Sequence, residues 1–191
     1  MIKNKRPDPD ELLKTIKEEE RKNHAGRLKI FLGYVAGVGK TYRMLSEAHF
    51  LKENNKDIIV GIAETHGRVE IEKLLKDLEV VPRKKIGYKG ILLDEFDIDG
   101  VLKRKPDYVL VDELAHTNVP GSRHLKRYND VEELLSAGIT VYTTLNIQHV
   151  ESLNDIIKQI TGVKVKETVP DRIIRLADKI EVVDLPTEEL I

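Results

Sequence analysis

The sequence contains no cysteine among its 191 residues. The absence of thiols excludes disulfides, thiolate catalysis and cysteine-based zinc sites, and it agrees with a reducing cytosolic setting. The longest apolar runs are strand-sized, at residues 58–63 and 108–111, and are far too short to cross a bilayer. The N-terminal residues lack the apolar core of a secretion signal. We therefore expect a cytoplasmic location and no direct insertion into a membrane.

No charge of one sign predominates. Lys and Arg total 32 and Asp and Glu total 33, a net charge of -1 with His neutral. Nucleic-acid-binding domains usually carry a clear basic excess, so nucleic acid is not an expected partner. The length suffices for one domain with a substantial core. A hydrophobic fraction of 40% and a charged fraction of 34% indicate a globular domain with a heavily charged surface.

Residues 1–26 are predicted to form a charged helix or arm. Asp8 is suited to cap a helix, Pro9 to occupy its first position, and the acids that follow to face the positive end of the helix dipole. The apolar face is thin, with only Leu12, Leu13 and Ile16. Two interpretations stay open: an arm packed loosely on the domain, or a docking element for another domain or subunit.

From residue 27 to residue 191, short apolar strands alternate with helical patterns. Strands are predicted over residues 28–32, 58–63, 85–88, 108–111, 139–145, 163–169 and 180–183. Helices are predicted over residues 41–54, 69–78, 96–103, 131–137 and 150–160. This alternation predicts an α/β fold, a mostly parallel sheet with helices on both faces, of the three-layer Rossmann-like kind found in P-loop NTPases. Ligands of such sheets bind beyond the carboxyl ends of the strands.

Residues 33–41 join the first strand to the first helix. Gly37 and Gly39 can adopt backbone angles that turn successive N–H groups toward a phosphate. Lys40 would then reach the β- and γ-phosphates of ATP, and Thr41 would bring its hydroxyl to Mg²⁺. The residues expected to bind the nucleotide here are Gly33, Ala36, Gly37, Val38, Gly39, Lys40, Thr41 and Tyr42.

The loop departs from the strict P-loop pattern at one position. That pattern has its first glycine where this chain has Tyr34, and Gly33 stands one position earlier. Either the loop is one residue longer, or Tyr34 tolerates the local turn. A glycine-rich turn with a surface lysine is the alternative, but placement between a strand and a helix favours phosphate binding.

Asp112 and Glu113 follow the apolar strand at residues 108–111. In P-loop proteins the first such Asp holds magnesium, so Thr41 and Asp112 are the expected metal ligands. A neighbouring Glu can orient or deprotonate an attacking water, which makes Glu113 a candidate catalytic base. Binding without hydrolysis requires only Asp112, so the pattern leaves open whether the chain is an enzyme.

Polar segments follow the other predicted strands. Asn146, or Thr144, is placed to contact a γ-phosphate from the neighbouring strand. Three arginines could neutralise phosphate charge or reach a partner's site, namely Arg68, Arg123 and Arg127.

Structural interpretations of some of these residues stay open. Arg127 could be surface charge, and His116 and His149 could be helix caps or loop hydrogen-bonders instead of catalysts. No pair of His residues has metal-ligand spacing with a third ligand, so we do not expect a zinc site.

Several longer strings occur together in this sequence. They are RPDPD (6–10), AGVGKT (36–41), ETHGR (64–68), VDELAHTN (111–118), PGSRH (120–124), DVEELL (130–135), YTTLN (142–146), His149 with ESLN (151–154), and ETVPD (167–171). On these strings the chain resembles the cytosolic N-terminal domain of the KdpD family, sensor histidine kinases that control potassium-uptake operons in bacteria. The resemblance runs from about residue 6 to the end. The family's loop has its first glycine at the same offset, which accounts for the departure at Tyr34.

The resemblance implies a regulatory input domain that binds ATP through Lys40 and Thr41 and magnesium through Asp112. Family members continue into a universal-stress-like domain, four membrane helices and the histidine-kinase core, so the implied partners are the remaining cytosolic domains. No phosphoacceptor helix is recognisable here, and the ending suggests an excised domain. Oligomerisation is left open. Two alternatives remain: a stand-alone P-loop NTPase or small-molecule kinase using Glu113, and a scaffold that binds proteins through residues 1–26.

Overall fold

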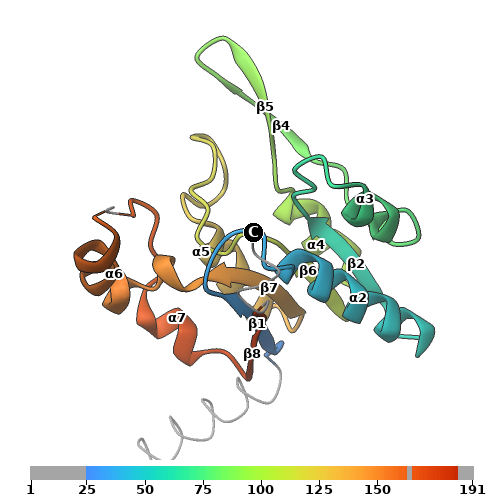
Figure 1. The fold of residues 1–191 in the computed structure, drawn as a ribbon. Coiled ribbons are helices and arrows are strands. Elements are labelled where there is room, and N and C mark those ends of the chain that lie inside the picture. Colours follow the sequence, from blue (N-terminus) through green and yellow to red (C-terminus); the bar gives the residue numbers. More distant parts are fainter. Residues whose placement is uncertain (1–24, 163–164, 185–191) are drawn as a thin grey trace, which may run out of the picture.

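A computed structural model describes residues 25–162 and 165–184. Within these residues a sheet of six strands forms the centre of the domain: β1 (Leu28–Gly33), β2 (Ile58–Ile62), β3 (Glu79–Val80), β6 (Tyr108–Val111), β7 (Thr140–Asn146) and β8 (Lys179–Val182). The strand order across this sheet is β3-β2-β6-β7-β1-β8, and every neighbouring pair is parallel (Figure 1). The predicted α/β fold with a mostly parallel sheet is confirmed.

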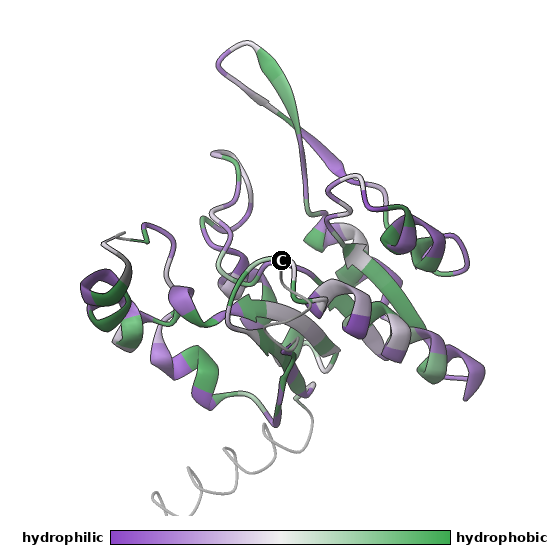
Figure 2. Ribbon diagram, viewed as in Figure 1, coloured by the Kyte–Doolittle hydropathy of each residue, from purple (hydrophilic) through white to green (hydrophobic). Residues whose placement is uncertain are grey.

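Helices cover both faces of the sheet. On one face α2 (Lys40–Glu53) and α3 (Val69–Leu75) pack against the strands, and Met44, Leu45 and Ala48 of α2 bury the apolar stripe predicted from helical spacing. On the other face lie α4 (Ile98–Arg104), α5 (Arg127–Ser136) and α7 (Asp171–Arg175), which pack on a second hydrophobic cluster. In Figure 2 green strands lie between helices that are green on one side and purple on the other. The result is a three-layer domain.

Burial on both faces explains the composition of the central strands. Every residue of β2 is buried, and β6 is buried from Val109 to Val111. Strands covered on both sides show continuous and not alternating hydrophobicity. Because these strands are parallel, their carboxyl ends all meet at one edge of the sheet, where the loops that carry the predicted site residues also lie.

An antiparallel hairpin projects from this body (Figure 1). The strand expected at residues 85–88 is present as β4 (Lys84–Tyr88), but its partner β5 (Ile91–Glu95) was not predicted. The two strands are joined by Lys89 and Gly90, with φ values of 49° and 82°. Two successive positive φ angles define the tight turn that favours hairpins, and Lys-Gly signals it less clearly than Asn-Gly.

The C-terminal third of the domain departs most from prediction. Residues 163–164 of the expected strand 163–169 lie outside the described residues, and residues 165–169 form only a single bridge, between Val169 and Val150. Because that bridge holds Val150 extended, the expected helix 150–160 begins only at α6 (Asn154–Thr161), after two short 3-10 turns. α7 and β3 were not predicted. Residues 131–137 were expected to end a helix, and α5 (Arg127–Ser136) does end there. The charged helix predicted within residues 1–26 falls on residues 1–24, which are outside the described residues.

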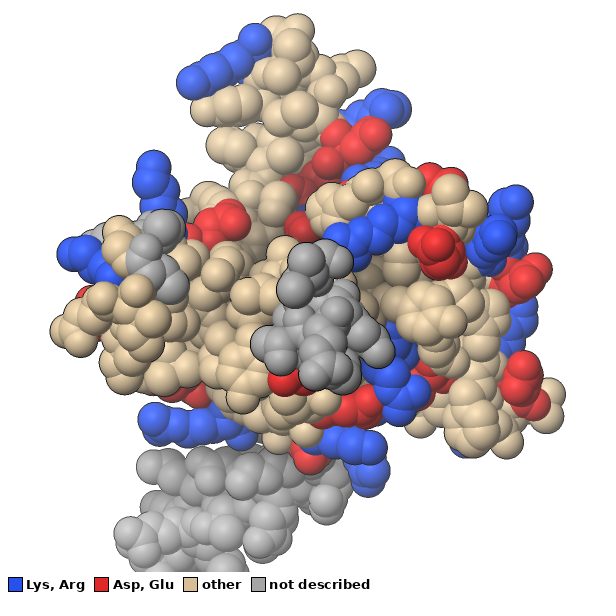
Figure 3. Space-filling model, viewed as in Figure 1, with Lys and Arg blue, Asp and Glu red and all other residues tan. Residues whose placement is uncertain are grey.

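Charge is spread over the visible face of the domain without one predominant sign (Figure 3), as expected from a net charge near zero. Among the described residues, no helix is both long enough and apolar enough to cross a bilayer.

Arg127 does not lie on the surface, so the interpretation of this residue as surface charge is wrong. Its side chain is 2% exposed, and its Nη2 donates to Glu95 Oε1 at 2.6 Å. Its Nη1 donates to the carbonyl oxygen of Asp112 at 3.3 Å. Glu95 ends β5, so this buried ion pair connects the base of the hairpin to the loop after β6.

We predict that Arg127→Met lowers the free energy of unfolding by about 3–5 kcal/mol, because it leaves the Glu95 carboxylate buried without its cationic partner. Urea denaturation followed by circular dichroism measures this loss. The double variant Glu95→Gln/Arg127→Met should recover part of it. The exposed pair Arg172–Glu132 supplies the control, because Arg172→Ala should cost less than about 1 kcal/mol. Equal losses for Arg127→Met and Arg172→Ala would contradict the prediction.

Candidate functional site

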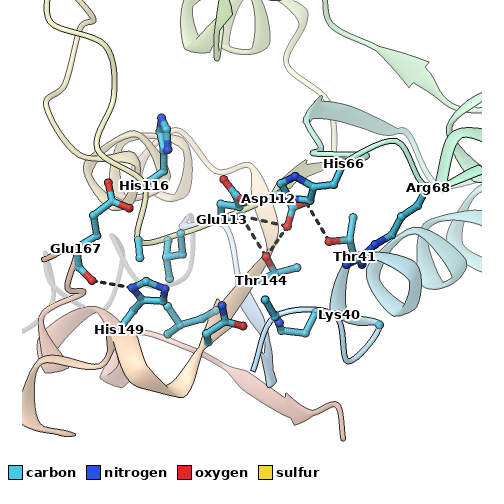
Figure 4. Close-up of a pocket in the computed structure, with 17 residues that line it drawn as sticks. Lys40, Thr41, His66, Arg68, Asp112, Glu113, His116, Thr144, His149 and Glu167 are labelled. Carbon is cyan, nitrogen blue, oxygen red and sulfur yellow. Dashed lines mark hydrogen bonds and ion pairs between the residues drawn. The ribbon is translucent and has the colours of Figure 1, made fainter. Parts of the chain in front are cut away.

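A cleft opens at the carboxyl edge of the sheet. It is lined by the loop after β1 with the start of α2, by the loops that follow β2 and β6, by the end of β7 with the turn after it, and by Glu167 (Figure 4). Five separate parts of the chain therefore contribute to one cavity.

The loop after β1 presents a concave backbone to this cleft. Gly37 and Gly39 have φ values of 91° and 88°, angles that residues with a Cβ atom rarely adopt. Gly39 is also the N-cap of α2, whose first turn has neither a side-chain cap nor an acidic residue. The N–H groups at the start of α2 therefore face the cleft with the positive end of the helix dipole and no carboxylate of their own.

Lys40 places a buried positive charge beside this loop. Its residue is 9% exposed, and its Nζ donates to the carbonyl oxygen of Val35 at 3.0 Å. Burial lowers the pKa of the Lys40 ammonium and the nearby Arg68 guanidinium lowers it further, whereas the Asp112 carboxylate raises it. An ammonium in such a position gains from an anion that enters the cleft, because the anion compensates for lost hydration.

Asp112 lies at the centre of the site and is 1% exposed. Its Oδ2 accepts hydrogen bonds from the Thr41 hydroxyl at 3.0 Å and from the Glu64 N–H at 3.2 Å. Its Oδ1 accepts from the Glu113 N–H at 3.1 Å and from the Thr144 hydroxyl. These bonds come from the start of α2, from the loops after β2 and β6, and from Thr144 within β7, so one carboxylate connects four parts of the chain (Figure 4).

The residues present fit Mg²⁺ accompanied by phosphate, not a metal site built from protein alone. Among the described residues no three His, Asp or Glu side chains are grouped to hold a metal ion. Mg²⁺ is usually held by one or two protein oxygens together with phosphate oxygens and water. The Thr41 hydroxyl and the Asp112 carboxylate are such oxygens, 3.0 Å apart. Each of the two carboxylate oxygens of Asp112 already accepts two hydrogen bonds. Asp112 is therefore suited to hold the ion through water and not by direct contact.

Glu113 and His66 meet across the opening of the cleft. His66 Nε2 lies 3.4 Å from Glu113 Oε1, although the two residues come from the loops after β2 and β6. Both backbones are in the left-handed region, with φ values of 47° for His66 and 57° for Glu113. Such angles cost roughly 1–3 kcal/mol for residues other than glycine and recur at functional sites. The backbone of Glu113 is held there by hydrogen bonds from its N–H to Thr144 Oγ1 and to Asp112 Oδ1.

The far end of the cleft contains His116, His149 and Glu167. Nδ1 of His149 donates to the carbonyl oxygen of Glu167 at 2.7 Å, so His149 does form a loop hydrogen bond. Glu167 Oε1 accepts a hydrogen bond from the Thr117 N–H at 2.8 Å. Burial raises the pKa of Glu167, but the hydrogen bonds from Thr117 and nearby positive charge have the larger effect, so this pKa lies below its usual value. His116 Nε2 lies 3.5 Å from the buried carboxylate of Glu95. Glu167 was not among the expected site residues, because it does not follow the carboxyl end of a predicted strand.

Most of the expected site residues lie together. The cleft is lined by ten of them: Ala36, Gly37, Gly39, Lys40, Thr41, Arg68, Asp112, Glu113, Thr144 and Asn146. Five others do not line it, among them Arg127, which is buried against Glu95. Gly33 lies beneath the loop, Val38 is buried, Tyr42 is exposed on α2, and Arg123 is paired with Asp99 and Glu133 on the surface. Two of the residues that the expectation missed, His66 and Glu167, occur in the strings ETHGR (64–68) and ETVPD (167–171), but neither was assigned a role in the site.

Together, the fold and the site define an α/β domain with a ligand cleft at the carboxyl edge of a parallel sheet, where a glycine-containing loop and a buried lysine face a buried carboxylate.

Comparison with known proteins gives the family. Residues 24–191 match the family described as "KdpD: Osmosensitive K+ channel His kinase sensor domain". The chain is 55% identical over 190 residues to the sensor protein KdpD of Clostridium acetobutylicum and 52% identical over 185 residues to that of Escherichia coli. These alignments cover 100% and 97% of the chain. The chain belongs to the KdpD family. It spans only about a fifth of the length of these two relatives, 21% and 20%.

A network of buried polar residues lies next to His116, which lines the cleft. Asn118 Nδ2 donates to Asp130 Oδ2 at 2.5 Å and to the carbonyl oxygen of His124 at 3.1 Å. Burial raises the pKa of Asp130 from 3.8 to about 6. Burial also raises the pKa of Glu95, but hydrogen bonds from His116 and from the backbone, with the charge of Arg127, lower it to about 2. The two carboxyl groups therefore titrate in separate pH ranges.

We predict that Asp130→Asn stabilises the domain at pH 7 by up to about 3 kcal/mol, since the pKa of Asp130 is raised from 3.8 to about 6 and one pKa unit is worth about 1.4 kcal/mol. The folded state binds the Asp130 proton more tightly than the unfolded state, so wild-type stability should fall as the pH rises from about 4 to about 6. Urea denaturation at pH 4, 5, 6 and 7 measures the difference, which should vanish near pH 4. The exposed Asp155→Asn is the control and should show no such dependence. Parallel curves for wild type and Asp130→Asn would refute the prediction.

Proposed function

We propose that this chain is an ATP- and Mg²⁺-binding input domain of a sensor histidine kinase that regulates potassium uptake in a two-component system. The names of its relatives support the sensor role. In this proposal the loop after β1 is a P-loop, the domain lies in the cytoplasm, and its partners are the remaining cytosolic domains of a longer protein. The chain's short span of its relatives supports the last point.

The proposal rests on one observation: the buried Lys40, the uncapped start of α2 and the hydrogen-bonded pair of Thr41 and Asp112 all line a single cleft. Backbone N–H groups at a helix N-terminus and a nearby lysine favour phosphate oxygens. Thr41 and Asp112 would hold Mg²⁺, which when bound neutralises charge on the phosphates. Arg68 lies against the loop, since a Cβ atom on Gly37 would be 3.6 Å from Arg68 Nη2, and it would add a second positive charge.

Ligand binding in this site would change the loops that the next domain contacts. Asp112 accepts hydrogen bonds from four parts of the chain, so a ligand that shifts Thr41 also alters the environment of the loops after β2 and β6 and of β7. Order in loops of this kind is a common way to signal nucleotide occupancy. Input to a kinase therefore requires binding, whether or not the nucleotide is hydrolysed.

We predict that Lys40→Ala weakens ATP binding at least about 30-fold, because loss of one partner of a buried charged contact costs about 2–5 kcal/mol. Isothermal titration calorimetry with ATP and Mg²⁺ measures the change. Lys56→Ala, an exposed lysine at the end of the turn after α2, is the matched control and should bind like wild type. Circular dichroism verifies that both variants are folded. Equal affinities of wild type and Lys40→Ala would refute ATP binding at this site.

A second candidate function is ATP hydrolysis or transfer of the γ-phosphate, favoured by the contact between His66 and Glu113 at the cleft opening. The carboxylate of Glu113 is partly exposed beside the phosphate-binding loop, so it is accessible to a water or a hydroxyl that attacks phosphate. In this role His66 would orient the carboxylate of Glu113.

For this second function we predict that Glu113→Gln lowers the rate of phosphate release at least about 100-fold, the usual contribution of a general base, while ATP affinity stays within threefold of wild type. A phosphate-release assay measures the rate, with Glu70→Gln as the exposed control on α3. If wild type binds ATP and releases no phosphate above the level without protein, the input-domain function stands alone.

A further inference from the structure

Tyr34 occupies an unusual place in the phosphate-binding loop. A Cβ atom on the preceding Gly33 would lie 2.6 Å from Val38 Cγ2 and 2.9 Å from Lys40 Cδ, so the crowded position of the loop is residue 33. Tyr34 keeps a negative φ, and its side chain is free to be large. The residue is 54% exposed. The one-residue offset of the glycine thus moves an aromatic ring to the edge of the loop.

Tyr34 forms one side of a shallow apolar depression lined by Leu32, Gly33, Tyr34, Ile147 and Val182. We call these five residues the apolar shelf. Leu32 of β1 pairs with Val182 of β8, and the Val183 N–H donates to the Leu32 carbonyl oxygen at 2.7 Å, so the floor of the shelf belongs to the sheet. Val182 is 59% exposed.

The apolar shelf adjoins the cleft at two places. Tyr34 is two residues from Ala36, which lines the cleft, and Ile147 directly follows Asn146, which also lines it. Successive Cα atoms are about 3.8 Å apart, so a single small molecule can contact both. The cleft has the charged groups, and the shelf has none. A ligand that matches both is anionic at one end and flat and apolar at the other.

We propose that the apolar shelf binds the nucleobase of the nucleotide, with the ring of Tyr34 stacked on the base. This inference rests on the proposed function, because it assumes that the phosphates bind in the cleft. Bases stack on aromatic side chains with little dependence on their identity. Only Tyr34 among the five shelf residues has a polar side-chain atom, so no side-chain amide or carboxylate reads the edge of the base. ATP and GTP therefore bind with similar affinity.

Calorimetry with three ligands separates the shelf from the phosphate site. ATP, GTP and inorganic tripolyphosphate, each with Mg²⁺, are titrated into wild type, Tyr34→Ala and Tyr34→Phe. Tyr34→Ala weakens ATP and GTP about tenfold or more, the usual effect of losing a stacking partner, and leaves tripolyphosphate unchanged. Tyr34→Phe keeps wild-type affinities. Phe50→Ala removes an aromatic residue of α2 that is 61% exposed and serves as the matched control.

Fluorescence supplies a readout that does not depend on affinity alone. The chain contains no tryptophan, so Tyr34→Trp introduces the sole indole. ATP and GTP quench this fluorescence by stacking, and tripolyphosphate does not. Phe50→Trp, the control, is not quenched by any of the three.

Four results would overturn the inference, each in a distinguishable way. Equal ATP affinity of wild type and Tyr34→Ala refutes the shelf and leaves the proposed function intact. Equal weakening of ATP and tripolyphosphate by Tyr34→Ala means that Tyr34 only shapes the loop. A Tyr34→Trp fluorescence that no nucleotide changes means that another part of the chain covers the shelf. Absence of binding of both ATP and tripolyphosphate to wild type refutes the proposed function, and the shelf with it.

Discussion

The buried carboxylate of Asp112 is the interaction on which the rest of the site depends. It accepts hydrogen bonds from Thr41, Glu64, Glu113 and Thr144, which lie in α2, in the loops after β2 and β6, and in β7. A carboxylate that is 1% exposed is stable only if its lone pairs are satisfied. The loops must therefore keep the positions that satisfy it, and a cleft with a defined shape results. In the proposed function, the same carboxylate would hold Mg²⁺ through water.

Several positive groups lie near Asp112, and one of them, the Lys40 ammonium, is buried. Lys40 loses hydration inside the domain, which lowers its pKa, and Arg68 lies against the same loop. The start of α2 adds unsatisfied N–H groups without any acidic residue to oppose them. The fold therefore maintains a small region that is electrostatically incomplete until an anion enters. In the proposed function this region binds the phosphates of a nucleotide, and in the further inference the uncharged surface beside Tyr34 binds the base.

Much of the fold could be predicted because local patterns and tertiary requirements agree there. The continuous apolar residues of β2 and β6 predict strands buried on both faces, and Met44, Leu45 and Ala48 predict the buried side of α2. The hairpin was only half predicted, since Glu95 is the only buried residue of β5 and its turn uses Lys89. Of the expected strand 163–169, the described residues 165–169 form only a single bridge, from Val169 to Val150. Pro170, which follows before α7, cannot donate a further strand hydrogen bond.

By itself the sequence determined the alternation of the main strands and helices, the glycine loop with Lys40 and Thr41, and the acidic strand end at Asp112, because each depends on residues close together in the chain. Only the tertiary structure decided the roles of Arg127 and Glu167, and the separation of Arg123 from the cleft. Arginine in a polar segment has the same local pattern whether it pairs with Glu95 in the core or with Asp99 on the surface. The difference is burial, which depends on how segments that are distant in the chain pack together. Local sequence patterns do not reveal this packing.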